Sequence, residues 1–166
     1  MTEKTFTPTP DQSTAFREAL GCFGTGVTVV TTNTDNGPRA ITVNSFSSVS
    51  LDPPLVLWCL AKDSHRFNSF NTCQHYSIHV MAEEQQEQAL KFARNGLDFS
   101  HADWDADHRG RPLLTECLAR FDCQLHAKHE AGDHLIIVGE VEQVMYRTGK
   151  GLIFKRGQFG GFADLL

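Results

Sequence analysis

The N-terminal part of the chain carries a helical pattern of hydrophobic residues. Phe16, Leu20 and Phe23 recur at helical spacing, which predicts an amphipathic helix that begins near Thr9-Pro10 and ends in the glycine-rich residues 21–26. A capping threonine followed by a proline in the first turn is typical of a helix start. We expect the apolar face of this helix to pack on the segments that follow it.

Most of the remaining chain shows the alternating or continuous apolar patterns that are typical of strands. Asp35-Asn36-Gly37 predicts a hairpin, because Asn-Gly accepts the positive φ angles of a tight turn. Asp52-Pro53-Pro54 predicts another turn, because neither proline has an N–H for a sheet ladder. Strands are therefore predicted over residues 26–32, 38–46, 55–61, 75–82, 115–130, 133–147 and 152–156.

Two short helices and a polar loop interrupt these strands. Ser64 is a predicted cap for a helix that carries Phe67 and Phe70, and a second helix is predicted over residues 84–94 with Gly96 as its left-handed stop. Residues 97–112 are polar and predict a loop. Many strands with few helices favour a mainly β fold, a closed β-barrel with short helices as plugs, in a single domain over residues 1–166.

Composition narrows the function classes. The 166 residues are 40% hydrophobic and 21% charged, which is typical of a globular protein. A net charge of -5 without a Lys/Arg run argues against a nucleic-acid partner. The apolar runs are too short to span a membrane, and the Thr-rich start lacks the apolar stretch of a signal peptide. Five cysteines without paired spacing favour small buried side chains in a reducing compartment, so we expect a cytoplasmic protein.

The first candidate for chemistry is the run of small polar residues 42–50, Thr-Val-Asn-Ser-Phe-Ser-Ser-Val-Ser. Small side chains leave main-chain N–H and C=O groups accessible, and the stiff proline turn follows directly. A planar heteroaromatic ring with alternating donors and acceptors along one edge, such as an isoalloxazine, matches such a surface. A serine-rich loop leaving a strand has the same composition.

Two further groups have polar chemistry. Lys62, Ser64, His65 and Arg66 combine cations, a hydroxyl and free N–H groups at a helix start, which suits an anion. A capped surface helix with solvated charges carries the same residues. Gly132-Asp133-His134, between the two longest strands, suits a ligand or a proton transfer, and equally a polar hairpin end.

Dinucleotide-fingerprint and metal motifs fail on spacing. Gly24-Thr25-Gly26 has Val29 where the third glycine of a dinucleotide fingerprint belongs and precedes a strand instead of following one. Cys123 and His126 lie on opposite faces of a predicted strand, which defeats shared coordination, so we expect no metal site.

Together these segments resemble the flavin reductase-like family, which has the FMN-binding split barrel and includes the reductase components of two-component flavin monooxygenases. The resemblance runs over nearly the whole chain in the right order. The matching segments are FGTGVTVVTT at residues 23–32, AITVNSFSSVSLDPPLV at 40–56, GDH at 132–134 and, more weakly, FKRGQF at 154–159.

The resemblance implies an NAD(P)H:flavin oxidoreductase that transfers hydride from nicotinamide C4 to flavin N5, with FMN or FAD as flavin. It implies a homodimer, with the flavin near the subunit interface, and a partner monooxygenase that receives reduced flavin. His134 is the implied catalytic residue near the nicotinamide, with Phe159 and Arg156 as neighbours. The implied cofactor-binding residues are Thr42, Val43, Asn44, Ser45, Ser48, Val49, Ser50, Cys59, Lys62, Ser64, Arg66 and Phe159. At His65-Arg66 the chain departs from the small hydroxyl residue that relatives often carry.

Two other functions fit the same residues. Reduced flavin on this scaffold can pass electrons to a corrinoid or a ferric chelate, and a flavin- or haem-binding protein needs no turnover at all. The sequence does not choose between FMN and FAD, nor between NADH and NADPH. An arginine pocket favours the 2′-phosphate of NADPH, and Arg39, Arg147 and Arg156 are each candidates for it.

Overall fold

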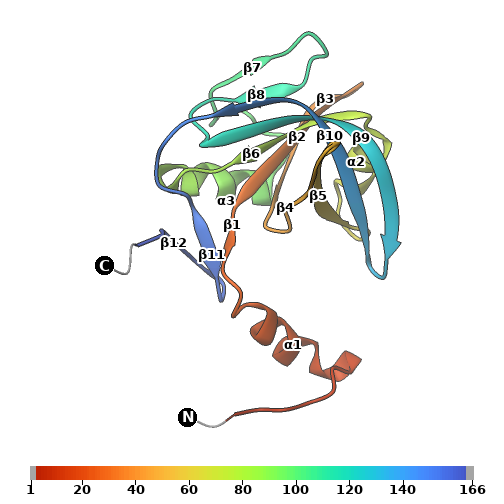
Figure 1. The fold of residues 1–166 in the computed structure, drawn as a ribbon, viewed down its shortest axis with the longest axis vertical. Coiled ribbons are helices and arrows are strands. Elements are labelled where there is room, and N and C mark those ends of the chain that lie inside the picture. The colour runs from red at the N-terminus through yellow and green to blue at the C-terminus, as the bar shows by residue number, and fades with distance from the viewer. Residues whose placement is uncertain (1–2, 164–166) are drawn as a thin grey trace.

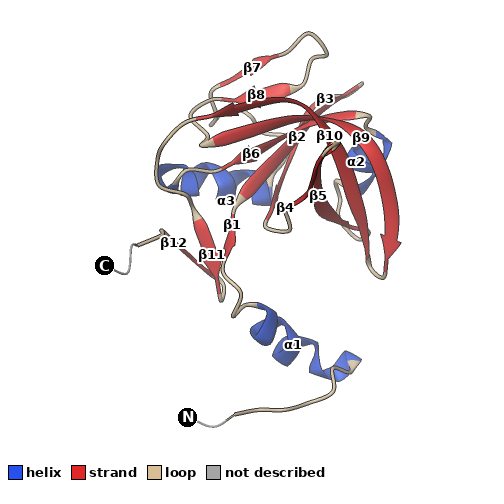
Figure 2. Ribbon diagram, viewed as in Figure 1, coloured by secondary structure: helices blue, strands red, loops and turns tan. Residues whose placement is uncertain are grey.

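A computed structural model describes residues 3–163, and its main feature is a strongly curled antiparallel sheet of seven strands (Figure 1, Figure 2). The hydrogen-bonded order is β3-β2-β6-β9-β10-β5-β4. The edge strands β3 and β4 do not pair with each other, so the mainly β expectation is confirmed but the expected closure of the barrel is wrong. The strands are β2 (Thr28–Thr34), β3 (Gly37–Val43), β4 (Ser47–Leu51), β5 (Pro54–Ala61), β6 (His75–Val80), β9 (Ala119–Ala131) and β10 (His134–Tyr146).

The predicted turns place the strands as expected, with small shifts. Asp35 and Asn36 form the two-residue loop between β2 and β3, and Gly37, not Asn36, takes the positive φ of 90°. The Asp52–Pro53 peptide is cis and joins β4 to β5. β4 itself was not predicted, because its serines lack the apolar alternation of a strand.

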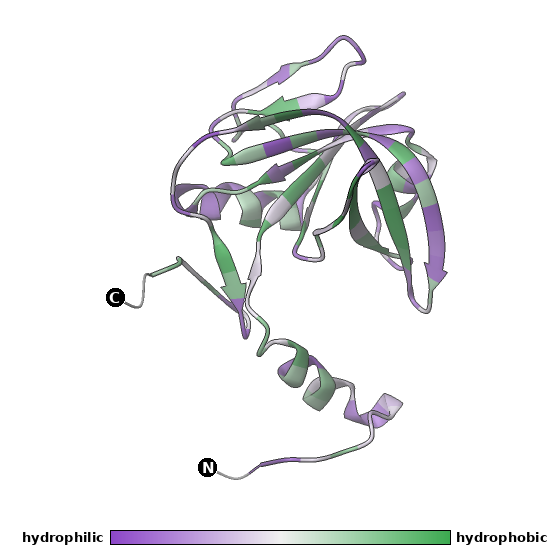
Figure 3. Ribbon diagram, viewed as in Figure 1, coloured by the Kyte–Doolittle hydropathy of each residue, from purple (hydrophilic) through white to green (hydrophobic). Residues whose placement is uncertain are grey.

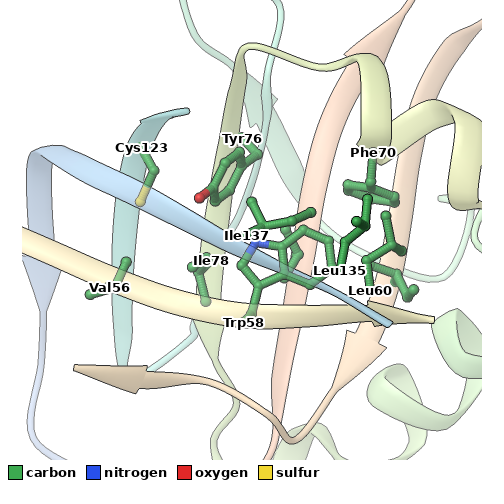
Figure 4. Close-up of a cluster of buried hydrophobic side chains, with 11 residues drawn as sticks. Val56, Trp58, Leu60, Phe70, Tyr76, Ile78, Cys123, Leu135 and Ile137 are labelled. Carbon is green, nitrogen blue, oxygen red and sulfur yellow. The ribbon is translucent and has the colours of Figure 1, made fainter. Parts of the chain in front are cut away.

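Hydrophobic side chains fill the concave face of the sheet. Alternate residues of β5 point inward, so Trp58 and Leu60 are fully buried beside Phe70 and Tyr76 (Figure 4). Trp58 meets both neighbouring rings edge-on, with centroid separations of 5.5 Å to Phe70 and 6.0 Å to Tyr76. Edge-on aromatic pairs of this kind add to the free energy gained from burial.

Two helices cover parts of the sheet. α2 (Phe67–Thr72) contributes Phe70 to the core, and α3 (Gln86–Arg94), preceded by the 3-10 turn Glu83–Gln85, buries Ala89 and Phe92. The predicted left-handed stop at Gly96 is wrong, because Gly96 lacks a positive φ. Glycine is needed there for another reason: a Cβ at this position would collide with the main-chain oxygen of Ala40.

The segment predicted as a polar loop contains a small hairpin. β7 (Trp104–Ala106) pairs with β8 (Pro112–Leu114). Arg111 lies between them, only 4% exposed, with its Nε 2.6 Å from Asp107 Oδ2. β9 begins at Ala119, later than predicted, because the chain bends at Glu116, whose φ is 61°.

A separate arm projects from one end of the sheet (Figure 1). It consists of a 3-10 turn (Pro10–Gln12), α1 (Ser13–Leu20) and a three-stranded sheet of β1 (Thr25–Gly26), β11 (Ile153–Lys155) and β12 (Gln158–Gly160). The Thr9 side chain makes no capping hydrogen bond.

The expected packing of α1 is wrong. No residue of α1 is buried, and Phe16 and Leu20 are 44% and 57% exposed. Figure 3 shows hydrophobic positions on this helix, which stands apart from the seven-stranded sheet. A helix of eight residues that is attached only through its C-terminal end contacts too little of the sheet for the apolar side chains of the helix to be buried there.

In the part of the chain that is described, no helix has the length and apolar character needed to cross a membrane.

Candidate active site

Two adjoining hollows lie where the arm meets the open seam of the sheet. The larger, about 660 Å³, is bounded by the end of α1, by β1 and β11, and by the connection between β3 and β4. The smaller, about 190 Å³, is lined by β3 residues and by Phe159 of β12. Asn44 and Phe154 line both hollows. The larger volume falls within the roughly 300–1,000 Å³ that is typical of small-molecule sites.

The connection between β3 and β4, residues 44–46, forms the polar wall of the larger hollow. The Cys59 N–H donates to Ser45 Oγ at 2.9 Å, which anchors the connection to β5. Within the described chain, the main-chain groups of residues 44–46 make no hydrogen bond to other main-chain atoms. Asn44 is exposed, and it lines both hollows. This wall therefore offers donors and acceptors to a ligand.

The structure divides the other predicted residues of this segment. Thr42 and Val43 line the smaller hollow with Phe159, and Thr42 Oγ1 donates to Ala89 O at 2.7 Å. Ser48, Val49 and Ser50 lie on β4 and line neither hollow. Cys59 is half-buried on the convex face of β5.

Arg66 lies beside α3, and Ser64 precedes it by two residues. The Arg66 main-chain N–H donates to Ser64 Oγ at 3.2 Å, one residue before α2 begins. Arg66 Nη2 donates to Phe92 O at 3.0 Å and Ala93 O at 2.9 Å, and burial lowers the pKa of this guanidinium. Thr42 bonds to the same helix, so residues 42–50 and the start of α2 both meet α3. The Arg66 guanidinium is already hydrogen-bonded to main-chain oxygens of α3.

Lys62 lies apart from Arg66, at the turn between β9 and β10. Its Nζ donates to Gly132 O at 2.7 Å and forms an ion pair with Glu130. In the same turn, His134 Nδ1 lies 2.7 Å from Asp133 Oδ1, and this contact lowers the pKa of the Asp133 carboxyl. Figure 1 shows this turn well separated from β12, so one chain does not bring His134 together with Phe159.

The sequence analysis missed two cations of the larger hollow. Arg17 of α1 and Lys155 of β11 line it together with Arg156. Lys155 and Arg156 belong to the FKRGQF match, which contained a usable signal. Nothing in the sequence pointed to Arg17, because its helix was expected to pack on the sheet and not to border a ligand site.

The described residues contain no group of three or more His, Cys, Asp or Glu side chains suited to a metal ion. Cys123 is fully buried on β9, whereas His126 of the same strand is exposed.

Comparison with known proteins gives a consistent family. The family described as "Flavin reductase like domain" matches residues 20–163. An FMN reductase (NADH), SmoA, from Agrobacterium fabrum is 50% identical over 97% of this chain and 92% of its own length. A relative from Rhodococcus jostii, the reductase subunit HsaB of a flavin-dependent monooxygenase, is 39% identical over 88% of this chain and 76% of its own length.

Solved structures agree with these relatives. The Streptomyces globisporus NADH:FAD oxidoreductase SgcE6, solved with NAD and FAD fragments, superposes with a TM-score of 0.89 at 35% identity and covers 97% of this chain and 99% of its own. Some relatives are longer, and this chain spans 64% and 50% of the length of two from Rhizobium meliloti.

Proposed function

Because the chain belongs to the flavin reductase-like family, we propose that it reduces FMN or FAD with NAD(P)H and passes the reduced flavin to a partner monooxygenase. The family resemblance drawn from the sequence is confirmed. The chain is an NAD(P)H:flavin oxidoreductase, with a nicotinamide nucleotide and a flavin as its reactants.

One observation carries the assignment of the flavin to the hollows. Residues 44–46 leave their main-chain groups unpaired with other described main-chain atoms, in a wall that also presents Asn44. The polar edge of an isoalloxazine needs such alternating donors and acceptors, and the apolar rings of Phe154 and Phe159 suit its faces. The residues of the site therefore fit a flavin.

When bound, the flavin supplies the hydride-accepting chemistry, so the protein's task is binding and alignment. Ser45 holds the connection to β5, and Thr42 holds the preceding strand β3 to α3, so the polar wall is anchored by hydrogen bonds within the protein. The main-chain N–H groups of residues 44–46 would stabilise negative charge at the polar edge of a bound ring. Phe154 and Phe159 line one side of the site with apolar rings, which would shield a bound ligand from water there.

We further propose that the site is completed by a second copy of the chain. The β9–β10 turn, next to which His134 begins β10, lies well apart from β12, which carries Phe159, so a site that uses both residues needs two subunits (Figure 1). Replacing His134 with Ala should weaken NAD(P)H use and leave flavin binding largely intact. An unchanged nicotinamide KM together with unchanged kcat would remove His134 from the proposal.

Partly exposed apolar surface supports the homodimer. Leu57, Cys59 and Ile136 are only half-buried on the convex face of β5 and β10, and the Phe16 side chain of α1 is 44% exposed. Light scattering should give twice the 18.5 kDa chain mass. Phe16→Ser should shift the population toward monomer, whereas Leu97→Ser, at a similarly exposed leucine, should not. A monomeric wild-type protein would contradict the homodimer.

The free cysteines support a cytoplasmic setting for the proposed function. All five cysteines are free thiols, which fits the reducing cytoplasm where NADH is available. The resemblance to the reductase subunit HsaB supports a separate monooxygenase as the acceptor of reduced flavin.

The activity is tested with purified protein, NADH and either FMN or FAD, by following the loss of NADH absorbance. We expect flavin-dependent NADH oxidation. Asn44→Ala should raise the flavin KM about tenfold, a loss of about 1.4 kcal/mol of binding. Asn36→Ala, at an exposed asparagine in the β2–β3 turn, is the matched control and should behave as wild type. No flavin-dependent oxidation with either flavin would refute the proposed function.

A further inference from the structure

Three cations line the larger hollow together with the polar wall. Arg17 lies in the last turn of α1, Lys155 ends β11, and Arg156 follows it in the turn to β12. All three are exposed, and none forms an ion pair with a carboxylate of the described residues. Among the residues that the structure describes, no acidic side chain lines this hollow. The chain has a net charge of -5, so the concentration of positive charge here runs against its overall balance.

The backbone fixes where these cations stand. The Arg156 N–H donates to Gly21 O at 3.0 Å, which ties the β11–β12 turn to the end of α1. Arg156 and Gly157 form the two-residue turn between the strands, with φ angles of 49° and 77°. Asparagine is the usual residue at the first position of such a turn, because a larger side chain is strained at positive φ. Turn geometry therefore does not explain an arginine here.

The other arginines considered for a nucleotide phosphate are engaged elsewhere. Arg39 donates to main-chain oxygens at the β2–β3 turn, including Pro38 O at 2.8 Å. Arg147 pairs with Glu84 at 3.0 Å. Arg156, by contrast, lines the hollow, and its side chain contacts Cys22 Sγ at 3.1 Å.

An aromatic ring stands beside the cations. Phe23 follows α1, lines the same hollow and is 78% exposed, a large exposure for a phenylalanine. Cations with a neighbouring exposed ring match a ligand that carries both phosphates and a flat base.

We propose that Arg17, Lys155, Arg156 and Phe23 form a subsite for the adenosine diphosphate arm of a dinucleotide, with the diphosphate on the cations and the adenine against Phe23. The inference rests on the proposed function, because it places this arm beside the flavin wall of the same hollow. FAD and NAD(P)H both carry such an arm, so the shared group defines the subsite and the experiment distinguishes the two sources.

The subsite is tested first without turnover, by calorimetric titration of the purified protein with ADP and, separately, with adenosine. We expect ADP to bind at least about tenfold more tightly than adenosine. Arg156→Asn, which suits the turn, should lower the ADP affinity about tenfold and leave the melting temperature at or above that of wild type. Lys150→Gln removes an exposed cation outside the hollow and should change nothing. Equal affinity for ADP and adenosine, or an Arg156→Asn affinity equal to wild type, would overturn the subsite whether or not the enzyme turns over.

Steady-state kinetics then identify the source of the arm. A rise in KM with Arg156→Asn for NADH but not for reduced nicotinamide mononucleotide assigns the subsite to the nicotinamide substrate. A rise for FAD but not for FMN assigns it to the flavin. Equal rises for mononucleotide and dinucleotide would overturn the proposal, because the mononucleotides lack the adenosine arm. Absence of flavin reduction by wild type would refute the proposed function, whereas the subsite would still stand or fall on the ADP titration.

Discussion

In the curled sheet, Trp58, Phe70 and Tyr76 are fully buried, whereas no residue of α1 is buried and Phe23 is 78% exposed. The sheet gains its stability from burial of large side chains within one chain. The arm is joined to the sheet by main-chain hydrogen bonds such as Leu152 N–H to Met81 O and by Phe154 and Phe159, which pack against the core, and it presents other side chains to the hollow. Substitutions in the sheet should therefore change the free energy of unfolding, and substitutions in the arm should change binding.

The largest expected effect is at the centre of the sheet. Trp58→Ala should lower the free energy of unfolding by about 3–5 kcal/mol, because it leaves a cavity among Phe70, Tyr76 and their neighbours. Phe23→Ala in the arm should change it by less than about 0.5 kcal/mol. Urea denaturation followed by far-ultraviolet circular dichroism measures both. Equal losses would abolish the contrast between the two regions.

Acid should weaken the sheet through His79. This side chain is fully buried between Val29 O and the Leu114 N–H, and burial lowers its pKa from 6.5 to about 3. Below pH 6.5, His79 binds a proton in the unfolded chain but stays neutral in the folded chain. The free energy of unfolding therefore falls as pH decreases from 6.5 toward 3. The loss attributable to His79 should reach about 3 kcal/mol near a pH of about 4.5.

His79→Gln tests this assignment, because glutamine does not titrate. The variant should be less stable near neutral pH, and its free energy of unfolding should fall less steeply between about pH 6.5 and about pH 4.5 than that of wild type. Parallel slopes for the two proteins would exclude His79 as the source.

Close packing between strands should make Gly139 sensitive. A Cβ at Gly139 would collide with Tyr76 Oη and crowd Cys123 Cβ, so Gly139→Ala should cost about 1–3 kcal/mol. Gly160→Ala in the arm is the matched control, because no described atom lies within 4 Å of a Cβ there. Thermal melts of the two variants compare them directly, and a Gly139→Ala melt like that of wild type would contradict the packing described.

A small gain in stability is expected at the arm's turn. Arg156→Asn should raise the free energy of unfolding by less than about 1 kcal/mol, because asparagine tolerates the φ of 49° better than arginine. Urea denaturation at matched salt measures it. A clear loss of stability would show that Arg156 supports the arm instead of serving a ligand.

The sheet was largely predictable because its signals are local. The alternation in residues 75–82 and the apolar run 55–61 correspond to β6 and β5, and the Asp-Asn-Gly and Asp-Pro-Pro signals mark real turns. β4 and the β7–β8 hairpin were missed because both are short and rich in polar residues. Their strand conformation comes from pairing with neighbours, which a local pattern does not encode.

The site was less predictable for a different reason. Asn44 and Ser45 were expected in it from a continuous motif, and both line the larger hollow. Arg17 and Lys155 are far apart in the sequence and meet only because the arm pairs β1 with β11. Lys62 and Arg66 are close in sequence, yet one turns to Glu130 and the other to α3. Only the three-dimensional structure shows which of these cations lie at the same site.

The open seam between β3 and β4 has a consequence for how the protein can evolve. In a fully closed barrel, the main-chain amides and carbonyls of residues 44–46 would form hydrogen bonds with a neighbouring strand. In this protein they form none with other described main-chain atoms and can bind a ligand. A ligand that is bound through main-chain N–H and C=O groups can be bound whichever side chains these residues carry. Residues 44–46 can therefore change in evolution while the protein still binds the same ligand, provided that β3 and β4 remain unpaired with each other.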